Sequence, residues 1–244
     1  MIKLEKVTKK YGTGSHALSD INISIDKGEF VFLIGPTGSG KTTIFRLLIR
    51  EMLPSEGNIV IDDWDIVNLP NKHLPHLRKK VGVVFQDLKL LPDRTIYENV
   101  ALPLEVIGVK PDDAKAKVES VLASVGILDH KDKFPIQLSG GELQRAAIAR
   151  ALILSPEILL ADEPTGNLDE VTTWEIVKLL QGINDKGTTV VMATHDPEVV
   201  KKLAKRVIAL DKGKLVRDDR PIKAEKSEEK TDQKTEEKEK EKAE

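Results

Sequence analysis

The eight residues GPTGSGKT, from Gly35 to Thr42, combine glycines, a lysine and a hydroxyl in an order suited to phosphate. In the pattern G-x-x-x-x-G-K-S/T, backbone amides surround the phosphates, the lysine reaches the outer phosphates and the hydroxyl ligates Mg²⁺. Lys41 and Thr42 occupy the last two positions, so the segment predicts a nucleoside triphosphate site with magnesium. The other residues of this segment expected to contact the nucleotide are Gly35, Pro36, Thr37, Gly38, Ser39, Gly40 and Thr43.

A pair of carboxylates, Asp162 and Glu163, directly follows the apolar run ILLA that begins at Ile158. A carboxylate at a strand end suits a magnesium ligand, and the next residue can polarise the attacking water in phosphoryl transfer. The alternative is that Asp-Glu before Pro164 only forms a turn. With the phosphate loop, the pair predicts hydrolysis, because a regulator that binds nucleotide without turnover has no use for a base at Glu163.

Gln86 and His195 also follow apolar runs, VGVVF from Val81 and TVVMA from Thr189. In an open parallel sheet, ligands bind beyond the carboxyl ends of the strands. We therefore expect both side chains to meet the phosphate loop and the carboxylate pair at one edge. Taken alone, His195 is more often a core or loop residue.

The stretch QLSGGELQRAAIARAL from Gln137 has a helical composition but begins with two poor helix formers, Gly140 and Gly141. Ser139 can cap the first turn, and Glu142 can reach back to the Ser139 amide, as in a capping box. Each glycine costs up to about 1 kcal/mol relative to alanine within a helix. Bare backbone at a helix N-terminus lets an anion approach, so we expect a phosphate of the nucleotide here.

The elements that must position these residues indicate an α/β fold. Alternating residues in the first 30 positions predict antiparallel strands, to which GNIVIDDWDI from Gly57 adds another, whereas the unbroken apolar runs predict a buried parallel sheet. The strand pattern stops between Asp87 and Leu138, and we expect a helical subdomain over about 87–154. Residues 218–244 are too polar to bury a core and are expected to be a disordered tail.

The amino-acid composition limits the partners, metal sites and cellular compartment to be expected. The chain has 244 residues, 40% of them apolar, and a net charge of -2, so no basic excess suggests a nucleic-acid partner. It lacks cysteine, which fits a reducing compartment and excludes thiolate metal sites. Neither a signal peptide nor a run of about 18 apolar residues is visible, so we expect a cytoplasmic protein. His73 and His76 have Pro75 between them and no third ligand nearby, which favours surface histidines.

Together these segments resemble the ATP-binding-cassette ATPases, from residue 1 to about residue 217. GPTGSGKT is similar to their Walker A motif and ILLADE to their Walker B motif. The other matches are the Q-loop glutamine at Gln86, the signature LSGGE at Leu138, the D-loop at Asn167-Leu168-Asp169, the switch histidine at His195, and the aromatic residue that stacks on adenine at Tyr11. Leu143 departs from the family, in which glutamine is common after the signature, and Thr42 replaces the usual serine.

The resemblance implies a P-loop NTPase fold and magnesium-dependent ATP hydrolysis. It assigns catalysis to Glu163, His195 and Lys41, and magnesium binding to Thr42, Gln86 and Asp162. It also implies a homodimer on ATP binding, in which the signature residues 139–142 of one subunit close over the γ-phosphate held by the other. Asp169 is expected at the same nucleotide.

The run LLADEPTGNLD resembles the branch of the family that contains lipoprotein-release, macrolide-efflux and cell-division ATPases. The segments FPIQLSGGE and VMATHD are most similar to the cell-division members. That similarity implies an FtsX-like integral membrane partner, an indirect link to peptidoglycan hydrolases, and a peripheral location on the inner face of the cell membrane. It also implies that the partner docks on residues 86–104.

The resemblance leaves two alternatives open. One is an ATPase subunit for lipoprotein release or macrolide export. The other is a soluble cassette protein of DNA repair or translation, although such proteins usually carry a long coiled-coil insertion or two cassettes, and neither is visible here.

Overall fold

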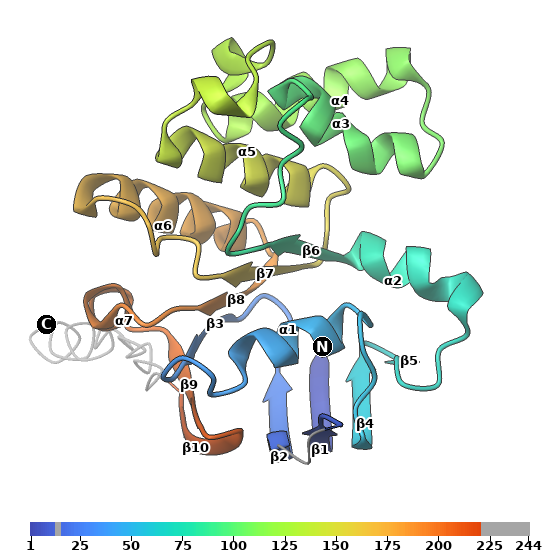
Figure 1. The fold of residues 1–244 in the computed structure, drawn as a ribbon, viewed down its shortest axis with the longest axis vertical. Helices are drawn as coiled ribbons and strands as arrows, with labels where there is room; N and C mark the ends of the chain where they lie inside the picture. Colours follow the sequence, from blue (N-terminus) through green and yellow to red (C-terminus); the bar gives the residue numbers. More distant parts are fainter. Residues whose placement is uncertain (13–15, 221–244) are drawn as a thin grey trace, which may run out of the picture.

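A six-stranded sheet in the order β10-β9-β3-β8-β7-β6 runs through the middle of the molecule (Figure 1). The computed structural model describes residues 1–12 and 16–220. Five strands are parallel, and the edge strand β10 is antiparallel to β9. Their bounds are Phe30–Ile34 for β3, Val81–Val84 for β6, Ile158–Asp162 for β7, Thr189–Ala193 for β8, Arg206–Asp211 for β9 and Lys214–Asp219 for β10. The expected parallel sheet is confirmed.

A second, antiparallel sheet has the order β2-β1-β4-β5. It consists of β1 (Ile2–Lys10), β2 (His16–Ile25), β4 (Glu56–Ile61) and β5 (Trp64–Asp65). Along β2, Ile21, Ile23 and Ile25 are buried while Asn22 and Ser24 are exposed, as expected for a sheet with one solvated face. This sheet confirms the antiparallel strands expected in the first 30 residues and in the segment from Gly57.

Two apolar clusters lie on opposite faces of the central sheet, because successive side chains of a strand point to opposite sides. In β3, Phe30 and Phe32 join the upper cluster, which contains apolar residues of the helices α3 (Ile96–Val106), α5 (Gly140–Leu152) and α6 (Glu170–Asp185). Val31 and Leu33 join a second cluster with α1 (Lys41–Leu48) and the antiparallel sheet. The strand is therefore apolar throughout, and its carboxyl end is held firmly from both sides.

The upper layer of Figure 1 contains α3 (Ile96–Val106), α4 (Pro111–Ser124) and α5 (Gly140–Leu152), with α6 (Glu170–Asp185) between this layer and the sheet. The helices α3, α4 and α5 lie within residues 87–154, the range expected for the helical subdomain. The remaining helices are α1 (Lys41–Leu48), α2 (Leu74–Lys80) and α7 (Pro197–Leu203), with short 3-10 turns at 71–73, 128–130 and 135–137.

Pro103 lies inside α3, although a proline in a helix interior usually kinks or ends the helix. Val100 and Leu104, on either side of it, are buried in the upper cluster. Packing of these residues holds the helix through the proline, since tertiary contacts contribute most of the stability of short helices.

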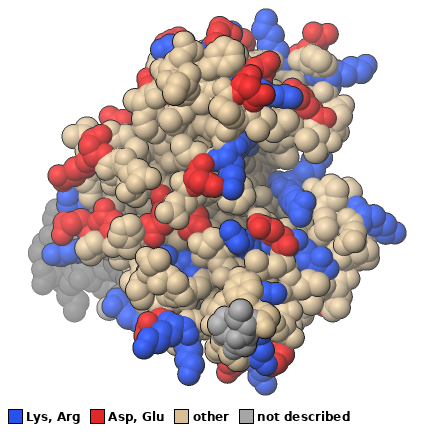
Figure 2. Space-filling view, in the orientation of Figure 1, with Lys and Arg blue, Asp and Glu red and all other residues tan. Residues whose placement is uncertain are grey.

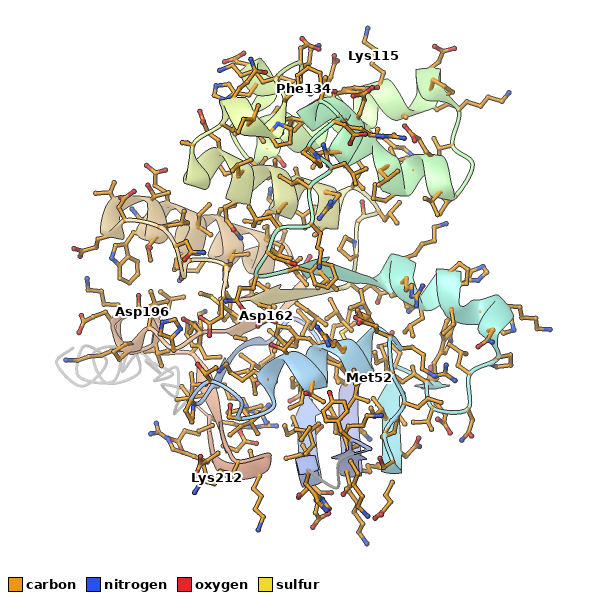
Figure 3. All side chains as sticks on the ribbon, in the orientation of Figure 1. Met52, Lys115, Phe134, Asp162, Asp196 and Lys212 are labelled. Atoms are coloured by element: carbon orange, nitrogen blue, oxygen red, sulfur yellow. The ribbon has the colours of Figure 1, made fainter. Side chains whose placement is uncertain are left out.

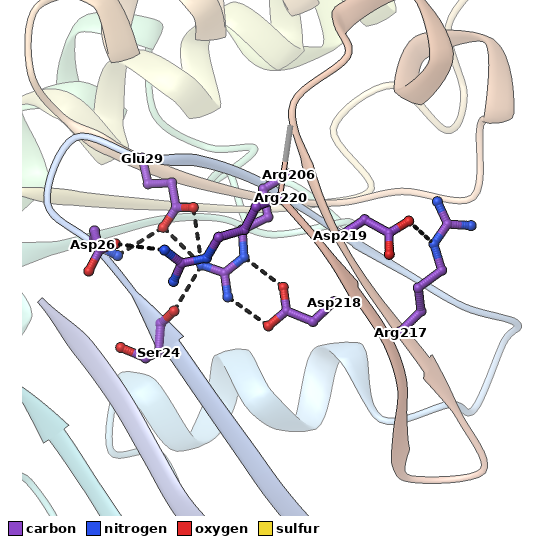
Figure 4. Close-up of polar contacts among 8 residues, drawn as sticks. All are labelled: Ser24, Asp26, Glu29, Arg206, Arg217, Asp218, Asp219 and Arg220. Carbon is purple, nitrogen blue, oxygen red and sulfur yellow. Dashed lines mark hydrogen bonds and ion pairs between the residues drawn. The ribbon is translucent and has the colours of Figure 1, made fainter. Parts of the chain in front are cut away.

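Strand β10 corrects the expected boundary after residue 217, because the strand continues to Asp219. Arg206 is 2% exposed, and its Nε and Nη2 atoms each donate to Asp218 at 2.7 Å (Figure 4). Its Nη1 atom also donates to Glu29 at 2.9 Å and to the carbonyl oxygen of Ser24 at 2.8 Å. Asp218 raises the pKa of this guanidinium. The rest of the expected tail, residues 221–244, lies outside the described residues.

We predict that Asp218→Asn lowers the free energy of unfolding by about 1–3 kcal/mol, because it leaves a buried guanidinium with less compensating charge. A drop in melting temperature of about 2–4 °C per kcal/mol is expected for a domain of this size. The matched control is Asp219→Asn, which removes an exposed ion pair with Arg217 and is expected to change stability by less than about 0.5 kcal/mol. Equal melting temperatures for the two variants would contradict the structural role of Asp218.

Candidate functional site

The phosphate loop connects β3 to α1 and is packed closely against its neighbours. Gly35 has φ 148° and Gly40 has φ 109°, a region that residues with a side chain rarely adopt. A Cβ atom on Gly35 would lie 2.2 Å from the carbonyl oxygen of Leu210, and one on Gly40 would lie 2.6 Å from Leu18 Cδ2. Both glycines are therefore required for the loop to sit between β9 and β2.

Polar groups of the loop are gathered where phosphate is expected. Lys41 is 8% exposed, and its Nζ atom donates to the carbonyl oxygens of Gly35 at 2.7 Å and Pro36 at 3.3 Å. The Oγ atom of Ser39 is buried and has no hydrogen-bond partner among the described residues. A buried cation and an unpaired hydroxyl within a loop of backbone amides suit an anionic ligand.

Thr42 Oγ1 donates a hydrogen bond of 2.8 Å to Asp162 Oδ2, which joins the first turn of α1 to the end of β7. Asp162 lies in the middle of the molecule and is 5% exposed (Figure 3). Burial raises the pKa of Asp162, and the hydrogen bond from Thr42 partly opposes that change. These adjacent oxygens fit a hard divalent cation, whose charge would stabilise the buried carboxylate.

Glu163 has a left-handed backbone, with φ 49°, and its amide donates to the carbonyl oxygen of Ala193 at 3.0 Å. This conformation directs the carboxylate between two basic groups. Its Oε2 atom lies 2.8 Å from His195 Nδ1, and its Oε1 atom lies 3.9 Å from Lys41 Nζ. A strained non-glycine residue held by a neighbouring strand is typical of functional sites.

One cavity of about 370 Å³ brings most of the expected site residues together. Its lining contains Tyr11, Thr37, Gly38, Ser39, Gly40, Lys41, Thr42, Thr43, Gln86, Asp162, Glu163 and His195. The polar residues that follow β3, β6, β7 and β8 thus meet at one edge of the sheet. Gln86 also lines an adjoining cavity of about 460 Å³, so it lies between the two.

Ala17 lines the same cavity and was missed by the sequence reasoning. It belongs to β2, and a Cβ atom on Gly40 would lie 2.8 Å from its carbonyl oxygen. No sequence signal marks Ala17, because it reaches the loop only through packing of the antiparallel sheet.

The signature helix α5 begins as expected. The Ser139 amide donates to Glu142 Oε2 at 2.7 Å, and the Glu142 amide donates to Ser139 Oγ at 3.4 Å, which completes the capping box. The bond from the Ser139 amide lowers the pKa of Glu142. None of the residues 139–142 lines the phosphate-loop cavity, so this helix end presents a separate surface.

The structure shows why position 141 needs a glycine, which the sequence did not reveal. A Cβ atom on Gly141 would lie 2.5 Å from Thr172 Cγ2 in α6. Thr172 cannot easily turn away, because its amide and hydroxyl donate to Asp169 at 2.9 and 2.6 Å. Those bonds lower the pKa of Asp169, which caps α6 and does not line the cavity. Gly141 is therefore needed for packing between α5 and α6.

Known proteins similar to this chain match it over most of its length. The family model described as ABC transporter matches residues 18–166. The cell division ATP-binding protein FtsE of Bacillus subtilis is 49% identical over 219 residues, covering 90% of this chain and 96% of that protein. The FtsE protein of Mycobacterium tuberculosis is 50% identical over 220 residues, covering 90% and 96%. That of Escherichia coli is 45% identical over 215 residues, covering 88% and 97%.

A solved structure is also similar: the dimeric, post-hydrolysis state of an ATP-binding cassette bound to ADP and Pi. Its TM-score is 0.83 at 38% identity, and the match covers 90% of this chain and 98% of that one. The helices within the described residues include none that is both long and apolar enough to cross a bilayer.

We predict that Gly141→Ala destabilises the protein by about 1–2 kcal/mol, since the clash with Thr172 outweighs the gain in helix propensity. Thr172→Ser removes the clashing methyl group and keeps the hydroxyl, so the double variant should recover most of the lost melting temperature. Gly140→Ala is the matched control and should be nearly neutral, because the added Cβ atom meets only the end of the Leu168 side chain, at 3.3 Å. Failure of Thr172→Ser to restore stability would show that the clash is not the cause.

Proposed function

This chain belongs to the ABC transporter family, and we propose that it is the ATPase subunit of a cell-division complex with an FtsX-like integral membrane protein. It binds and hydrolyses ATP as the ATPase subunit of an ABC system. The observation that carries the proposal is one cavity that holds Lys41, the Thr42–Asp162 pair and Glu163, in a chain that is 45% to 50% identical to three cell-division ATP-binding proteins.

Glu163 is assigned the role of general base. The oxygen of a water molecule forms a bond to the γ-phosphorus, the bond from phosphorus to the ADP oxygen breaks, and the proton of the water passes to the Glu163 carboxylate. His195, 2.8 Å from the carboxylate, keeps it in place. Lys41 donates to the phosphate oxygens, exchanging its present carbonyl partners for charged ones.

The magnesium ligands in this proposal are Thr42, Asp162 and Gln86. The hydroxyl and the buried carboxylate already lie 2.8 Å apart, and Gln86 lines the same cavity. Oxygen donors of this kind suit Mg²⁺, which when bound neutralises phosphate charge. Tyr11 lines the cavity and is 41% exposed, so its ring is accessible to adenine.

A homodimer accounts for the position of the signature residues. Residues 139–142 lie outside the cavity of their own chain, so in this proposal they contact the nucleotide of a second copy, with Asp169 nearby. Gly140 leaves the helix N-terminus open to the γ-phosphate, as its amides and dipole favour an anion. ATP then joins two copies through two shared sites.

The membrane protein is proposed to dock in a third cavity, of about 490 Å³, between α2 and β6 on one side and α3 and α5 on the other. Figure 2 shows a hollow of the surface with Lys and Arg at its edge, and the lining includes Leu102, Pro103, Phe85 and Arg78. Docking here would place the subunit on the inner face of the membrane and link ATP hydrolysis, through the partner, to peptidoglycan hydrolases.

Leu90 and Tyr97, two apolar residues of the expected docking segment 86–104, pack against the upper cluster. A charge at either position would disturb the core as well as any docking surface. Leu102 is the better probe, because it is only half-buried and lines the cavity directly.

We predict that Glu163→Gln lowers kcat for ATP hydrolysis by about 100-fold or more, because the amide keeps the shape of the side chain but cannot accept the proton. ATP affinity, measured by equilibrium binding, should stay within about threefold of the wild type. Glu5→Gln, a change on an exposed position of β1, is the control and should leave both quantities unchanged. Wild-type turnover by the Glu163 variant would exclude the assigned base.

We predict that Leu102→Asp weakens capture of the membrane partner at least tenfold in pull-downs from detergent-solubilised membranes, since it buries an unpaired charge in the interface. Val216→Asp, at an exposed apolar position on β10, is the matched control. Melting temperature and ATP binding must be equal for the two variants. If Leu102→Asp still captures the partner as the wild type does, the docking site lies elsewhere. If the wild type instead captures a lipoprotein-release or efflux permease, the cell-division assignment is wrong.

A further inference from the structure

Two consecutive residues just after Gln86 have a left-handed backbone: Leu88, with φ 56°, and Lys89, with φ 55°. Residues with a side chain rarely adopt this conformation, and two in succession need support from the surrounding structure. The amide of Leu88 donates to the carbonyl oxygen of Phe85, closing a tight turn around Gln86. The position of Gln86 therefore depends on whatever holds these two residues.

One side chain supplies that support. Arg150 of α5 donates from Nη2 to the carbonyl oxygen of Leu88 and from Nη1 to that of Lys89, at 2.5 and 2.6 Å. Two adjacent carbonyl oxygens match the planar fork of a guanidinium, a geometry that a lysine ammonium cannot reproduce. Burial lowers the pKa of Arg150, and among the described residues no carboxylate forms an ion pair with it. The hydrogen bonds of its guanidinium thus go to the two carbonyl oxygens of the turn.

Arg150 and the signature residues are parts of the same helix. α5 runs without interruption from Gly140 to Leu152, so its N-terminus and Arg150 lie about 15 Å apart at 1.5 Å per residue. Leu88 and Leu90 pack against the cluster to which Ala146, Ala147 and Ile148 of α5 belong. The turn after Gln86 is therefore attached to the signature helix by both hydrogen bonds and packing.

We propose that Arg150 is a positioning residue for ATP hydrolysis, which holds the turn that presents Gln86 to the nucleotide and ties that turn to the signature helix. The inference rests on the proposed role of Gln86 as a ligand in the nucleotide site. Arg150 touches neither the nucleotide nor the reacting water; it acts through Gln86.

The test measures steady-state ATP hydrolysis by the full chain with Mg²⁺. Arg150→Met should lower kcat at least tenfold and change KM for ATP less than threefold, because Tyr11 and the phosphate loop are untouched. Arg150→Lys should give an intermediate kcat, since a lysine can engage one carbonyl at a time. Gln86→Ala should lower kcat as well, and the double variant Gln86→Ala/Arg150→Met should be no slower than Gln86→Ala alone, as residues acting through one another are not additive.

Arg145→Met is the matched control on the same helix. Arg145 donates to the carbonyl oxygen of Val125 at 2.9 Å and to Glu175 at 2.7 Å, and so joins α5 to α4 and α6 and makes no bond to the turn. It should lower the melting temperature while keeping kcat within twofold of the wild type. An equal loss of kcat in both variants, or none in Arg150→Met, overturns the proposal.

The outcomes separate this inference from the proposed function. Absence of ATPase activity in the wild type would refute the function itself. Normal turnover by Gln86→Ala would remove the role of Gln86 and with it the inference. If Arg150→Met does not fold, Arg150→Lys decides, and wild-type kcat in that variant overturns the positioning role.

Discussion

Parallel pairing of β3, β8, β7 and β6 is the constraint on which the rest of the structure depends. Because these strands share one direction, the residues that follow them begin at a single edge of the sheet. The phosphate loop, Gln86, Asp162 and His195 are far apart in the chain, yet each takes its position from the end of a strand that is buried on both faces. Rigid packing of the strands thus gives a precise arrangement of polar groups that are not themselves in the core.

The charged side chains of the site, Lys41, Asp162 and Glu163, are close together but are not all directly paired with one another. Lys41 Nζ lies 3.9 Å from the Glu163 carboxylate, and among the described residues the Asp162 carboxylate has only the Thr42 hydroxyl as a hydrogen-bond partner. Burial disfavours the ionised form of Asp162, while the backbone of Glu163 is held in a strained conformation. Both features cost stability, and a divalent cation bound with the nucleotide would offset the cost of burying the Asp162 carboxylate.

The helix α5 connects three parts of the molecule. Its N-terminus carries the signature residues, Gly141 allows it to lie against Thr172 beside Asp169, and Arg150 near its other end holds the turn after Gln86. Arg150 also lines the cavity proposed for the membrane partner. A movement of this helix would therefore displace both the turn after Gln86 and the lining of that cavity.

The sequence alone determined the α/β fold, the phosphate loop, the capping box at Ser139 and the polar residues that end the strands, because these follow from local spacing and from strand and helix periodicity. Tertiary structure decided the rest: that Asp218 belongs to the last strand, that Gly141 packs on Thr172, that Ala17 lines the cavity and that Arg150 holds the turn. Each of these depends on a partner 10 or more residues away in the chain, which no local pattern specifies. In the sequence, Asp218 looks like the first residue of a charged tail. In the folded chain it pairs with the buried guanidinium of Arg206, because a buried charge requires a partner of opposite sign.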